Sequence, residues 1–181
     1  MLGEIIKQKF EKTVGPRLLK LKVSATMLTL IGGVFALIAG YFLFKGLLVL
    51  GGVFILLNYL FDGIDGIVAR ATKTTSNVGF ILDHTFDFVL RRIWYFALAY
   101  AGFISYDIVA LAIFSLAASV LLSDLVKIKS LKFPRYSGAW ADWLIIPAVF
   151  INVLLFFQIM IVCNIILFLV NFFSVLYLNR K

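Results

Sequence analysis

Four aspartates lie in one stretch of an otherwise apolar chain. Asp62 and Asp65 are three residues apart and Asp83 and Asp87 are four apart, so the members of each pair would share one face of a helix. Two like charges about 4 Å apart cost roughly 4 kcal/mol at an effective dielectric constant of about 20. The carboxylates therefore need protons or cations. Oxygen ligands without His or Cys select hard ions such as Mg²⁺, Mn²⁺ or Ca²⁺, and such sites suggest phosphate chemistry.

Small residues and one arginine accompany these carboxylates. Gly63, Gly66 and Gly79 carry no side chain that would keep a ligand away from the helix backbone. Arg70 adds a permanent cation whose planar guanidinium can hold a phosphate through two hydrogen bonds. The segment from Asp62 to Asp87 is therefore suited to binding metal ions together with a diphosphate.

The composition indicates that a membrane surrounds this segment. Of the 181 residues, 63% are hydrophobic and 14% are charged, and the mean hydropathy is +1.07. A water-soluble domain of this length cannot bury so large an apolar share. The net charge of +8 is gathered in short segments between apolar runs, which is typical of loops that meet anionic headgroups and argues against a nucleic-acid partner.

We expect an all-α polytopic membrane protein with six transmembrane helices, preceded by an amphipathic surface helix at the N-terminus. Apolar runs near the ~20 residues needed to cross the hydrocarbon layer alternate with short polar breaks, and only Gln158 marks the last break. The surface helix would cover residues 1–22, and a single membrane domain would cover residues 1–181 with its bundle over 24–178. The predicted spans cover residues 24–43, 47–69, 78–101, 105–126, 139–157 and 159–178.

Basic residues gather on one side of this layout. With the N-terminus in the cytoplasm, that side would hold six basic residues in the tail, two after the second span, four after the fourth and two at the C-terminus. The other side would hold only Lys45. The positive-inside rule thus predicts cytoplasmic termini, and it places all four aspartates at the cytoplasmic edge of the second and third spans.

Two sets of residues bear on helix packing. Gly32, Ala36 and Gly40 form a stripe of small residues that would let two helices approach closely, although membrane helices also tolerate glycine without such a role. Asn164 and Asn171 are seven residues apart on one helical face. We expect these two amides to form interhelical hydrogen bonds rather than to bind substrate.

Two alternatives to a phosphate-binding site stay open at this point. The aspartates could be a protonated or ion-paired cluster that only holds helices together, or they could line a proton or cation pathway of a transporter. Transporter sites typically lie near the membrane midplane on broken helices, whereas these aspartates lie at the predicted cytoplasmic edge.

The order and spacing of eight residues resemble, without a gap, the signature of the CDP-alcohol phosphotransferases, also called class I CDP-alcohol phosphatidyltransferases. The length, the six predicted spans and the basic N-terminus are also similar to this family. The resemblance implies metal-dependent transfer of a phosphatidyl-type group from a CDP-linked lipid to the hydroxyl of a small polar alcohol, with release of CMP, in phospholipid biosynthesis. The matching residues are Asp62, Asp65, Gly66, Ala69, Arg70, Gly79, Asp83 and Asp87.

The same resemblance implies a role for each matching position. Asp62, Asp65 and Asp83 would bind the metal, expected as a pair of Mg²⁺ or Mn²⁺ ions, and Asp87 would complete the metal site and act as the base on the acceptor hydroxyl. The CDP moiety would lie against five residues, one of which, Asp62, would also bind the metal. That set is Asp62, Gly66, Ala69, Arg70 and Gly79.

The residues after Asp83 follow neither of two subfamily patterns. Members that transfer to glycerol phosphate tend to read Pro-x-Ala-Asp-Lys, and members that transfer to inositol phosphate tend to read Ser-x-x-Asp-Arg. This chain reads His-Thr-Phe-Asp-Phe over 84–88, and Arg91 follows one helical turn after Asp87. Arg91 would either hold an acidic acceptor or form an ion pair with Asp87 or Asp124. Arg135 is the other candidate for binding the acceptor.

The resemblance also implies partners and a location. The donor would be a CDP-linked lipid in a multi-pass protein of the cell membrane, with the active site on the cytoplasmic side, and a homodimer is typical of the family. The acceptor would be a phosphorylated polyol such as inositol phosphate or glycerol phosphate. Serine as the acceptor, or a soluble CDP-polyol as the donor, is the alternative within the same chemistry.

Overall fold

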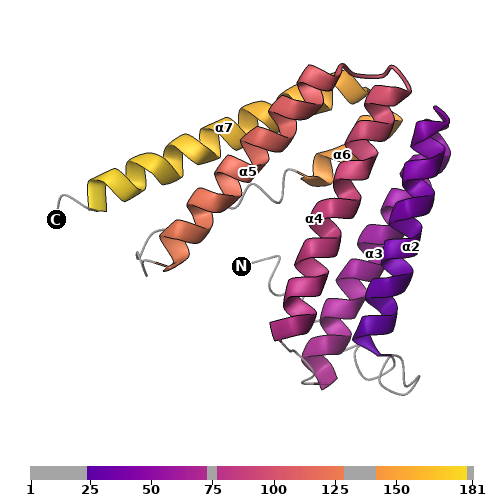
Figure 1. The fold of residues 1–181 in the computed structure, drawn as a ribbon, viewed down its shortest axis with the longest axis horizontal. Helices are drawn as coiled ribbons and strands as arrows, with labels where there is room; N and C mark the ends of the chain where they lie inside the picture. The colour runs from indigo at the N-terminus through magenta and orange to yellow at the C-terminus, as the bar shows by residue number, and fades with distance from the viewer. Residues whose placement is uncertain (1–23, 73–76, 129–141, 179–181) are drawn as a thin grey trace. The chain divides into compact units, whose positions relative to one another are not determined.

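The computed structural model describes residues 24–72, 77–128 and 142–178, and within these ranges it leaves out the side chains of residues 70, 77–87, 124–128 and 178. Every element in the described ranges is helical (Figure 1), which confirms the all-α class. The predicted surface helix over 1–22 lies outside the described residues. The α-helices are α2 (Ala25–Phe44), α3 (Leu48–Thr72), α4 (Asn77–Tyr100), α5 (Tyr106–Ile128), α6 (Ile145–Phe150) and α7 (Val153–Leu178).

Four of these helices are long and apolar enough to cross a membrane. They are residues 25–44 of α2, 48–69 of α3, 106–123 of α5 and 153–177 of α7. The third predicted span, 78–101, corresponds to α4, whose first side chains are not described. In the fifth predicted span, 139–157, the structure describes the six-residue helix α6 and the start of α7. The apolar helices support a membrane protein, while the count of six spans stays a prediction.

Polar side chains at the helix starts set two of the boundaries. The Ser24 hydroxyl accepts a hydrogen bond from the Met27 N–H at 3.2 Å, and the Asn152 side-chain oxygen accepts one from the Leu155 N–H at 2.9 Å. Both contacts satisfy amide groups that a helix start leaves without a partner. The predicted break at Gln158 is therefore wrong: α7 begins directly after Asn152, and Gln158 lies inside it.

A glycine ends α4. Gly102 has φ 81°, which favours a residue without a side chain. The N–H of Phe103 bonds to the carbonyl of Leu98 and the N–H of Gly102 bonds to that of Ala99, both at 3.0 Å. These two bonds form a Schellman cap, and the chain then turns from α4 into α5.

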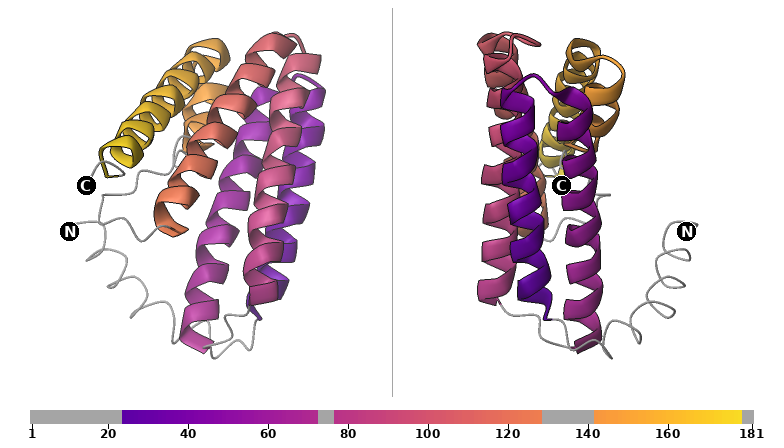
Figure 2. Two further views of the ribbon diagram at one scale, coloured as in Figure 1. Left: turned by 60° about the vertical axis from the view of Figure 1, so that its left-hand side comes forward. Right: turned by 90° about the vertical axis from the view of Figure 1, so that its right-hand side faces the viewer.

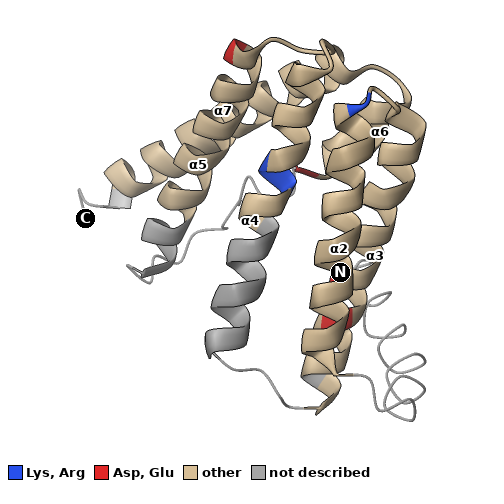
Figure 3. Cartoon of the chain, turned by 45° about the vertical axis from the view of Figure 1, so that its right-hand side comes forward, with Lys and Arg blue, Asp and Glu red and all other residues tan. Residues whose placement is uncertain are grey.

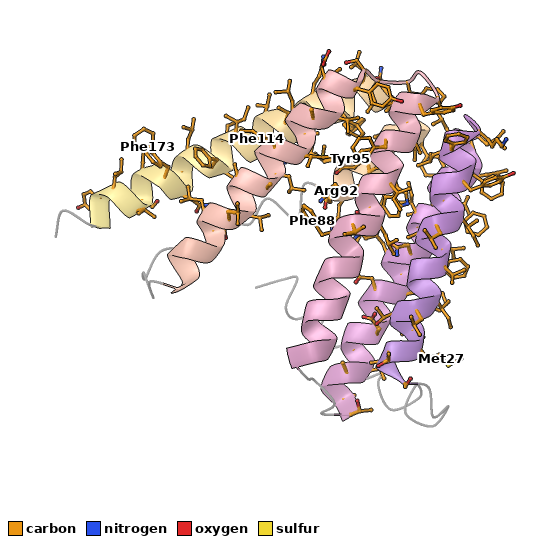
Figure 4. The ribbon with its side chains drawn as sticks, in the orientation of Figure 1. Met27, Phe88, Arg92, Tyr95, Phe114 and Phe173 are labelled. Atoms are coloured by element: carbon orange, nitrogen blue, oxygen red, sulfur yellow. The ribbon has the colours of Figure 1, made fainter. Side chains whose placement is uncertain are left out.

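The helices bury several small and polar residues and expose many large apolar ones. On α7 the side chains of Asn164 and Asn171 are buried, whereas Phe173 is 62% exposed. On α2 the small-residue stripe is buried, whereas Met27 is 55% exposed and projects outward, as does Phe173 (Figure 4). Water would penalise this arrangement, but lipid favours it, since close helix contacts use small and polar groups in membranes.

The described chain forms two compact units, and the first contains its residues up to Leu43 together with Leu50–Trp94. Here the stripe on α2 lies against both neighbouring helices. A Cβ added at Gly32 would lie 3.5 Å from the Cβ of Phe61 on α3, and one at Gly40 would lie 3.0 Å from Ile93 on α4. The stripe therefore lies in a close helix contact, which agrees with the first of its two interpretations, the close approach of two helices.

The second unit contains Phe44–Val49 and the chain from Tyr95 onward, and α5 and α6 both pack on α7 in it (Figure 2). The buried Tyr95 hydroxyl lies 2.6 Å from Asp142 Oδ1 and 3.2 Å from the sulfur of Met160. Among the described residues, no hydrogen-bond partner is found for the buried amide of Asn164. The expected interhelical bond of Asn164 is thus not seen.

A methyl group at Gly51 tests the tight contact between α2 and α3. Its Cβ would lie 2.7 Å from Cγ of Leu43, a side chain that is fully buried and has little room to move. We expect Gly51→Ala to lower the free energy of unfolding by about 1–3 kcal/mol through overpacking, measured by thermal unfolding in detergent.

The matched control for this prediction is Gly63→Ala, since a Cβ at Gly63 meets nothing within 4 Å and alanine has the higher helix propensity. This variant should melt at or above the wild-type temperature. Equal melting of Gly51→Ala and wild type would contradict the packing described for this contact.

Candidate active site

Helix α3 carries the first two signature aspartates in its C-terminal half. Asn58, Asp62 and Asp65 follow one another at spacings of four and three residues and so share a face of the helix. Asp65 is 4% exposed, and the side chain of Asp62 is 26% exposed. Two carboxylates thus lie largely away from water on a helix that is otherwise apolar, so each needs a donor or a cation beside it.

Arg91 on α4 provides this partner for Asp62. Its Nη2 lies 3.1 Å from Oδ2 of Asp62, and the same guanidinium lies 4.5 Å from the centre of the Tyr59 ring, one helical turn before Asp62. This cation–π contact and the ion pair together hold Arg91 against α3. Of the two roles expected for Arg91, an ion pair is found, and its described partner is Asp62. The side chains of Asp87 and Asp124, the partners that were expected, are not described.

The Tyr59 ring that contacts Arg91 packs in turn on Trp94. The rings of Tyr59 and Trp94 meet edge to face, with 6.1 Å between their centres, and both are buried. The Trp94 indole N–H donates to the carbonyl of Ala36 on α2 at 2.8 Å. All three helices of the first unit therefore fix the position of the Arg91 guanidinium.

Thr29 on α2 is a partner of Asp65. Its hydroxyl lies 2.6 Å from Asp65 Oδ2. The sequence patterns did not predict this residue, because one threonine among apolar residues gives no pattern by itself. A signal was nevertheless present: Thr29 lies three residues before Gly32, at the start of the stripe that continues through Ala36 and Gly40. A polar residue on a packing stripe faces another helix.

Arg92 lies beside Arg91 in the sequence but has different surroundings. It is 7% exposed, and its guanidinium carbon lies 4.9 Å from the centre of the Phe88 ring (Figure 4). Phe88 stands where the two subfamily patterns have a cation. An aromatic ring at this position therefore serves as a surface for a neighbouring arginine.

The remaining predicted site residues are described only in part. Gly66 and Ala69 lie on α3 and are partly exposed, and the space next to Gly63 is open, since a Cβ there would meet nothing within 4 Å. Positions 79, 83 and 87 precede Arg91 on α4 at intervals of four residues. The side chains of four predicted site residues are not described. They are Arg70, Asp83, Asp87 and Arg135. Of Gly79 the structure describes only that it lies in α4.

The donor set fits a hard divalent cation as far as it is described. Asp62 and Asp65 supply carboxylate oxygens, which Mg²⁺ and Mn²⁺ prefer, and both carboxylates have a hydrogen-bonding partner on another helix. Such partners orient ligands in metal sites. Among the described side chains no group of three or more His, Cys, Asp or Glu residues could hold an ion. Two of the four predicted ligands are not in that set.

Figure 3 shows how few charges the described helices carry, with α2 and α7 free of charged residues. The Asp62–Arg91 pair should therefore be strongly coupled. We expect a double-mutant cycle of Asp62→Asn and Arg91→Gln to give a coupling energy of about 1–3 kcal/mol in thermal unfolding, because each single substitution already removes the charge–charge interaction of this pair.

The control for this cycle combines Asp62→Asn with Thr26→Val, an exposed position on α2. The effects of these two substitutions should add to within about 0.5 kcal/mol. If the effects of Asp62→Asn and Arg91→Gln were equally additive, the ion pair would contribute nothing specific to the fold.

Comparison with known proteins gives a family for this arrangement. The model of the CDP-alcohol phosphatidyltransferase family matches residues 22–177. An archaetidylinositol phosphate synthase of Pyrococcus horikoshii is 31% identical over 116 residues, which cover 62% of this chain and 61% of that protein. A bifunctional IPC transferase and DIPP synthase of Aquifex aeolicus is 32% identical over 117 residues, which cover 65% of this chain and 25% of that protein.

The chain thus spans less than two thirds of the length of either relative. The family match, in contrast, extends over all the described helices except the last residue of α7, and it includes the whole signature from Asp62 to Asp87. The chain belongs to the CDP-alcohol phosphatidyltransferase family.

Proposed function

We propose that this protein transfers a phosphatidyl-type group from a CDP-linked lipid to the hydroxyl of a small polar alcohol and releases CMP. The family implies a transferase with a CDP-linked donor and an alcohol acceptor. The observation that carries the proposal is the state of Asp62 and Asp65: they share one face of α3, and each is bonded to a side chain of another helix. This is the arrangement expected of ligands held ready for a metal ion.

Asp62, Asp65, Asp83 and Asp87 are the proposed metal ligands. Members of this family generally depend on a divalent metal ion, and two Mg²⁺ or Mn²⁺ ions are the proposed choice here. When bound, such ions neutralise charge on the diphosphate and make CMP a better leaving group. The spacing of positions 83 and 87 from Arg91 supports this set, since Arg91 bonds across to Asp62 from the same helix, α4.

The other groups of the chain bind the donor and move a proton. Arg70 holds the diphosphate, and Gly66, Ala69 and Gly79 leave room for the CDP moiety next to the helix backbones. The Asp87 carboxylate removes the proton from the acceptor hydroxyl. The acceptor oxygen then forms a bond to the phosphorus of the donor as the bond from that phosphorus to CMP breaks, and CMP leaves with the electron pair.

The proposed acceptor is a phosphorylated polyol, such as inositol phosphate or glycerol phosphate. The names of the two relatives support this, because one is an archaetidylinositol phosphate synthase and the other combines an IPC transferase with a DIPP synthase. Arg91 is the proposed acceptor ligand in the described part of the chain, with Arg135 as a second. Serine as the acceptor or a soluble CDP-polyol as the donor is the alternative within the same chemistry.

The exposed apolar faces of α2 and α7 support a location in the cell membrane. In the proposed topology the chain is one domain that crosses the membrane six times after an N-terminal surface helix, and its termini and active site face the cytoplasm. The lipid tails of the donor would lie along the apolar helices. A homodimer is also proposed, by analogy with the family.

The reaction itself can be tested directly. Purified protein with a CDP-linked lipid and Mg²⁺ or Mn²⁺ should release CMP when inositol 1-phosphate or glycerol 3-phosphate is added, and less with inositol, glycerol or serine. Asp87→Asn should reduce the rate at least about 100-fold, since a general base typically contributes 10²–10⁴-fold. No CMP release with any acceptor, or release that Asp87→Asn leaves unchanged, would rule out the proposed reaction.

The acceptor assignment has its own test. Arg91→Ala and Arg135→Ala should each raise the KM for the phosphorylated acceptor about tenfold or more, because a hydrogen bond to a charged group contributes roughly 1.5–3 kcal/mol. The KM for the CDP-linked donor should change little in Arg135→Ala, whereas Arg91→Ala should raise it as well, because Arg91 is bonded to Asp62. Lys45→Ala, at an exposed position, is the control. An unchanged acceptor KM in both arginine variants would remove these residues from the acceptor site.

A further inference from the structure

We propose that Thr29 is a positioning residue of the metal site: its hydroxyl holds the carboxylate of Asp65 in the orientation in which that carboxylate binds the ion. The proposal rests on the proposed function, which makes Asp65 a metal ligand. It adds α2 to the site, although the signature residues themselves lie on α3 and α4.

The contact between Thr29 and Asp65 has the geometry of a strong hydrogen bond. The oxygen–oxygen distance of 2.6 Å falls in the range of bonds from a hydroxyl to an ionised carboxylate. Thr29 Oγ1 also lies 3.2 Å from the carbonyl of Ala25 on its own helix. The hydroxyl has one hydrogen, and the nearer acceptor, which in the proposed function is an ionised metal ligand, takes it. Asp65 therefore accepts a charge-assisted bond from a side chain that is not a metal ligand.

The side chain of Thr29 has little freedom to move away from this contact. A threonine in a helix has restricted χ1 rotamers, and one of them places the hydroxyl next to a carbonyl of the preceding turn. The Ala25 contact shows that Thr29 adopts this rotamer. Asp65 is itself buried, so few water molecules can replace the hydroxyl as its donor.

A second polar contact fixes α2 relative to α3 one turn along from Thr29. The Asn58 side-chain N–H donates to the carbonyl of Gly32 at 3.0 Å. The two helices are in direct contact here, since a Cβ at Gly32 would lie at ordinary van der Waals distance, 3.5 Å, from the Cβ of Phe61. Because the helices are this close, a side chain as short as threonine reaches across to Asp65.

The consequence concerns metal affinity. A group that orients a metal ligand typically changes affinity about 10–100-fold when it is removed. In Thr29→Val the shape of the side chain is kept and the hydroxyl is lost. Thr29→Ser keeps the hydroxyl, and Thr26→Val makes the same chemical change at an exposed position three residues away on α2.

The test is Mn²⁺ binding to purified protein in detergent, without nucleotide or lipid donor, with free Mn²⁺ measured by electron paramagnetic resonance. We expect Thr29→Val to raise the Kd for Mn²⁺ about tenfold or more, Thr29→Ser to stay within about threefold of wild type, and Thr26→Val to match wild type. Thermal unfolding monitors the fold of each variant. If Thr29→Val does not fold, Thr29→Ala takes its place: its Kd for Mn²⁺ should be about tenfold or more above that of wild type, while that of Thr29→Ser stays within about threefold.

Asp65→Asn separates this inference from the proposed function. If Asp65→Asn lowers Mn²⁺ affinity while Thr29→Val binds Mn²⁺ as wild type does, the positioning role is overturned and the metal site stands. If Asp65→Asn binds Mn²⁺ with unchanged affinity, Asp65 is not a ligand, and both the metal site as proposed and the role of Thr29 are overturned. Loss of affinity in Thr29→Ser equal to that in Thr29→Val would also overturn the role of the hydroxyl.

Discussion

Negative charge in an apolar helix bundle has to be balanced, and the described part of this site follows from that constraint. Asp62 and Asp65 lie on a helix whose other residues are mostly apolar, where an ionised group without a partner is very unfavourable. Two other helices contribute partners: α4 supplies the guanidinium of Arg91 as a counter-ion of Asp62, and α2 supplies the hydroxyl of Thr29 as a hydrogen-bond donor to Asp65. The three helices of the first unit must therefore pack closely, and the small residues of α2 permit this.

The same packing relates the site to the membrane. Small and polar residues take part of the interior of the helix pairs, and many large apolar side chains lie on the outside, where lipid can contact them. A donor with lipid tails needs such surfaces, and a polar acceptor needs a charged site at their edge. In the proposed reaction both substrates meet at the aspartates, with the headgroup chemistry at the membrane boundary and the tails along the helices.

The proposed centre of the site comes from the sequence, because its signals are local. The aspartates and glycines repeat at intervals of three and four residues, which is the periodicity of a helix face, and the family match includes all of them. The partners of those aspartates were harder to predict. The pairing of Arg91 with Asp62 and the contact of Thr29 with Asp65 depend on how three helices are placed side by side, and spacing within one helix does not contain that information.

The helix boundaries show a similar difference between local and distant signals. The end of α4 at Gly102 follows from a single glycine. The start of α7 could not be predicted from polarity alone, because Gln158 is as polar as a break would be, yet Asn152 caps the helix and Gln158 lies on its exposed side. Asn164 is buried without the expected hydrogen bond among the described residues. A polar residue in an apolar run can therefore be a cap, a buried group or an exposed one, and packing decides which.

The central claim is that Asp62 and Asp65 bind a divalent ion that in turn holds the CDP moiety. Equilibrium binding of CDP to the purified protein, with and without Mn²⁺, tests this most directly. We predict that CDP binds only in the presence of Mn²⁺ and that Asp62→Asn and Asp65→Asn each abolish this binding, while Thr26→Val binds as wild type does. Binding of CDP that is equally tight without the ion, or that survives both aspartate substitutions, would contradict the account.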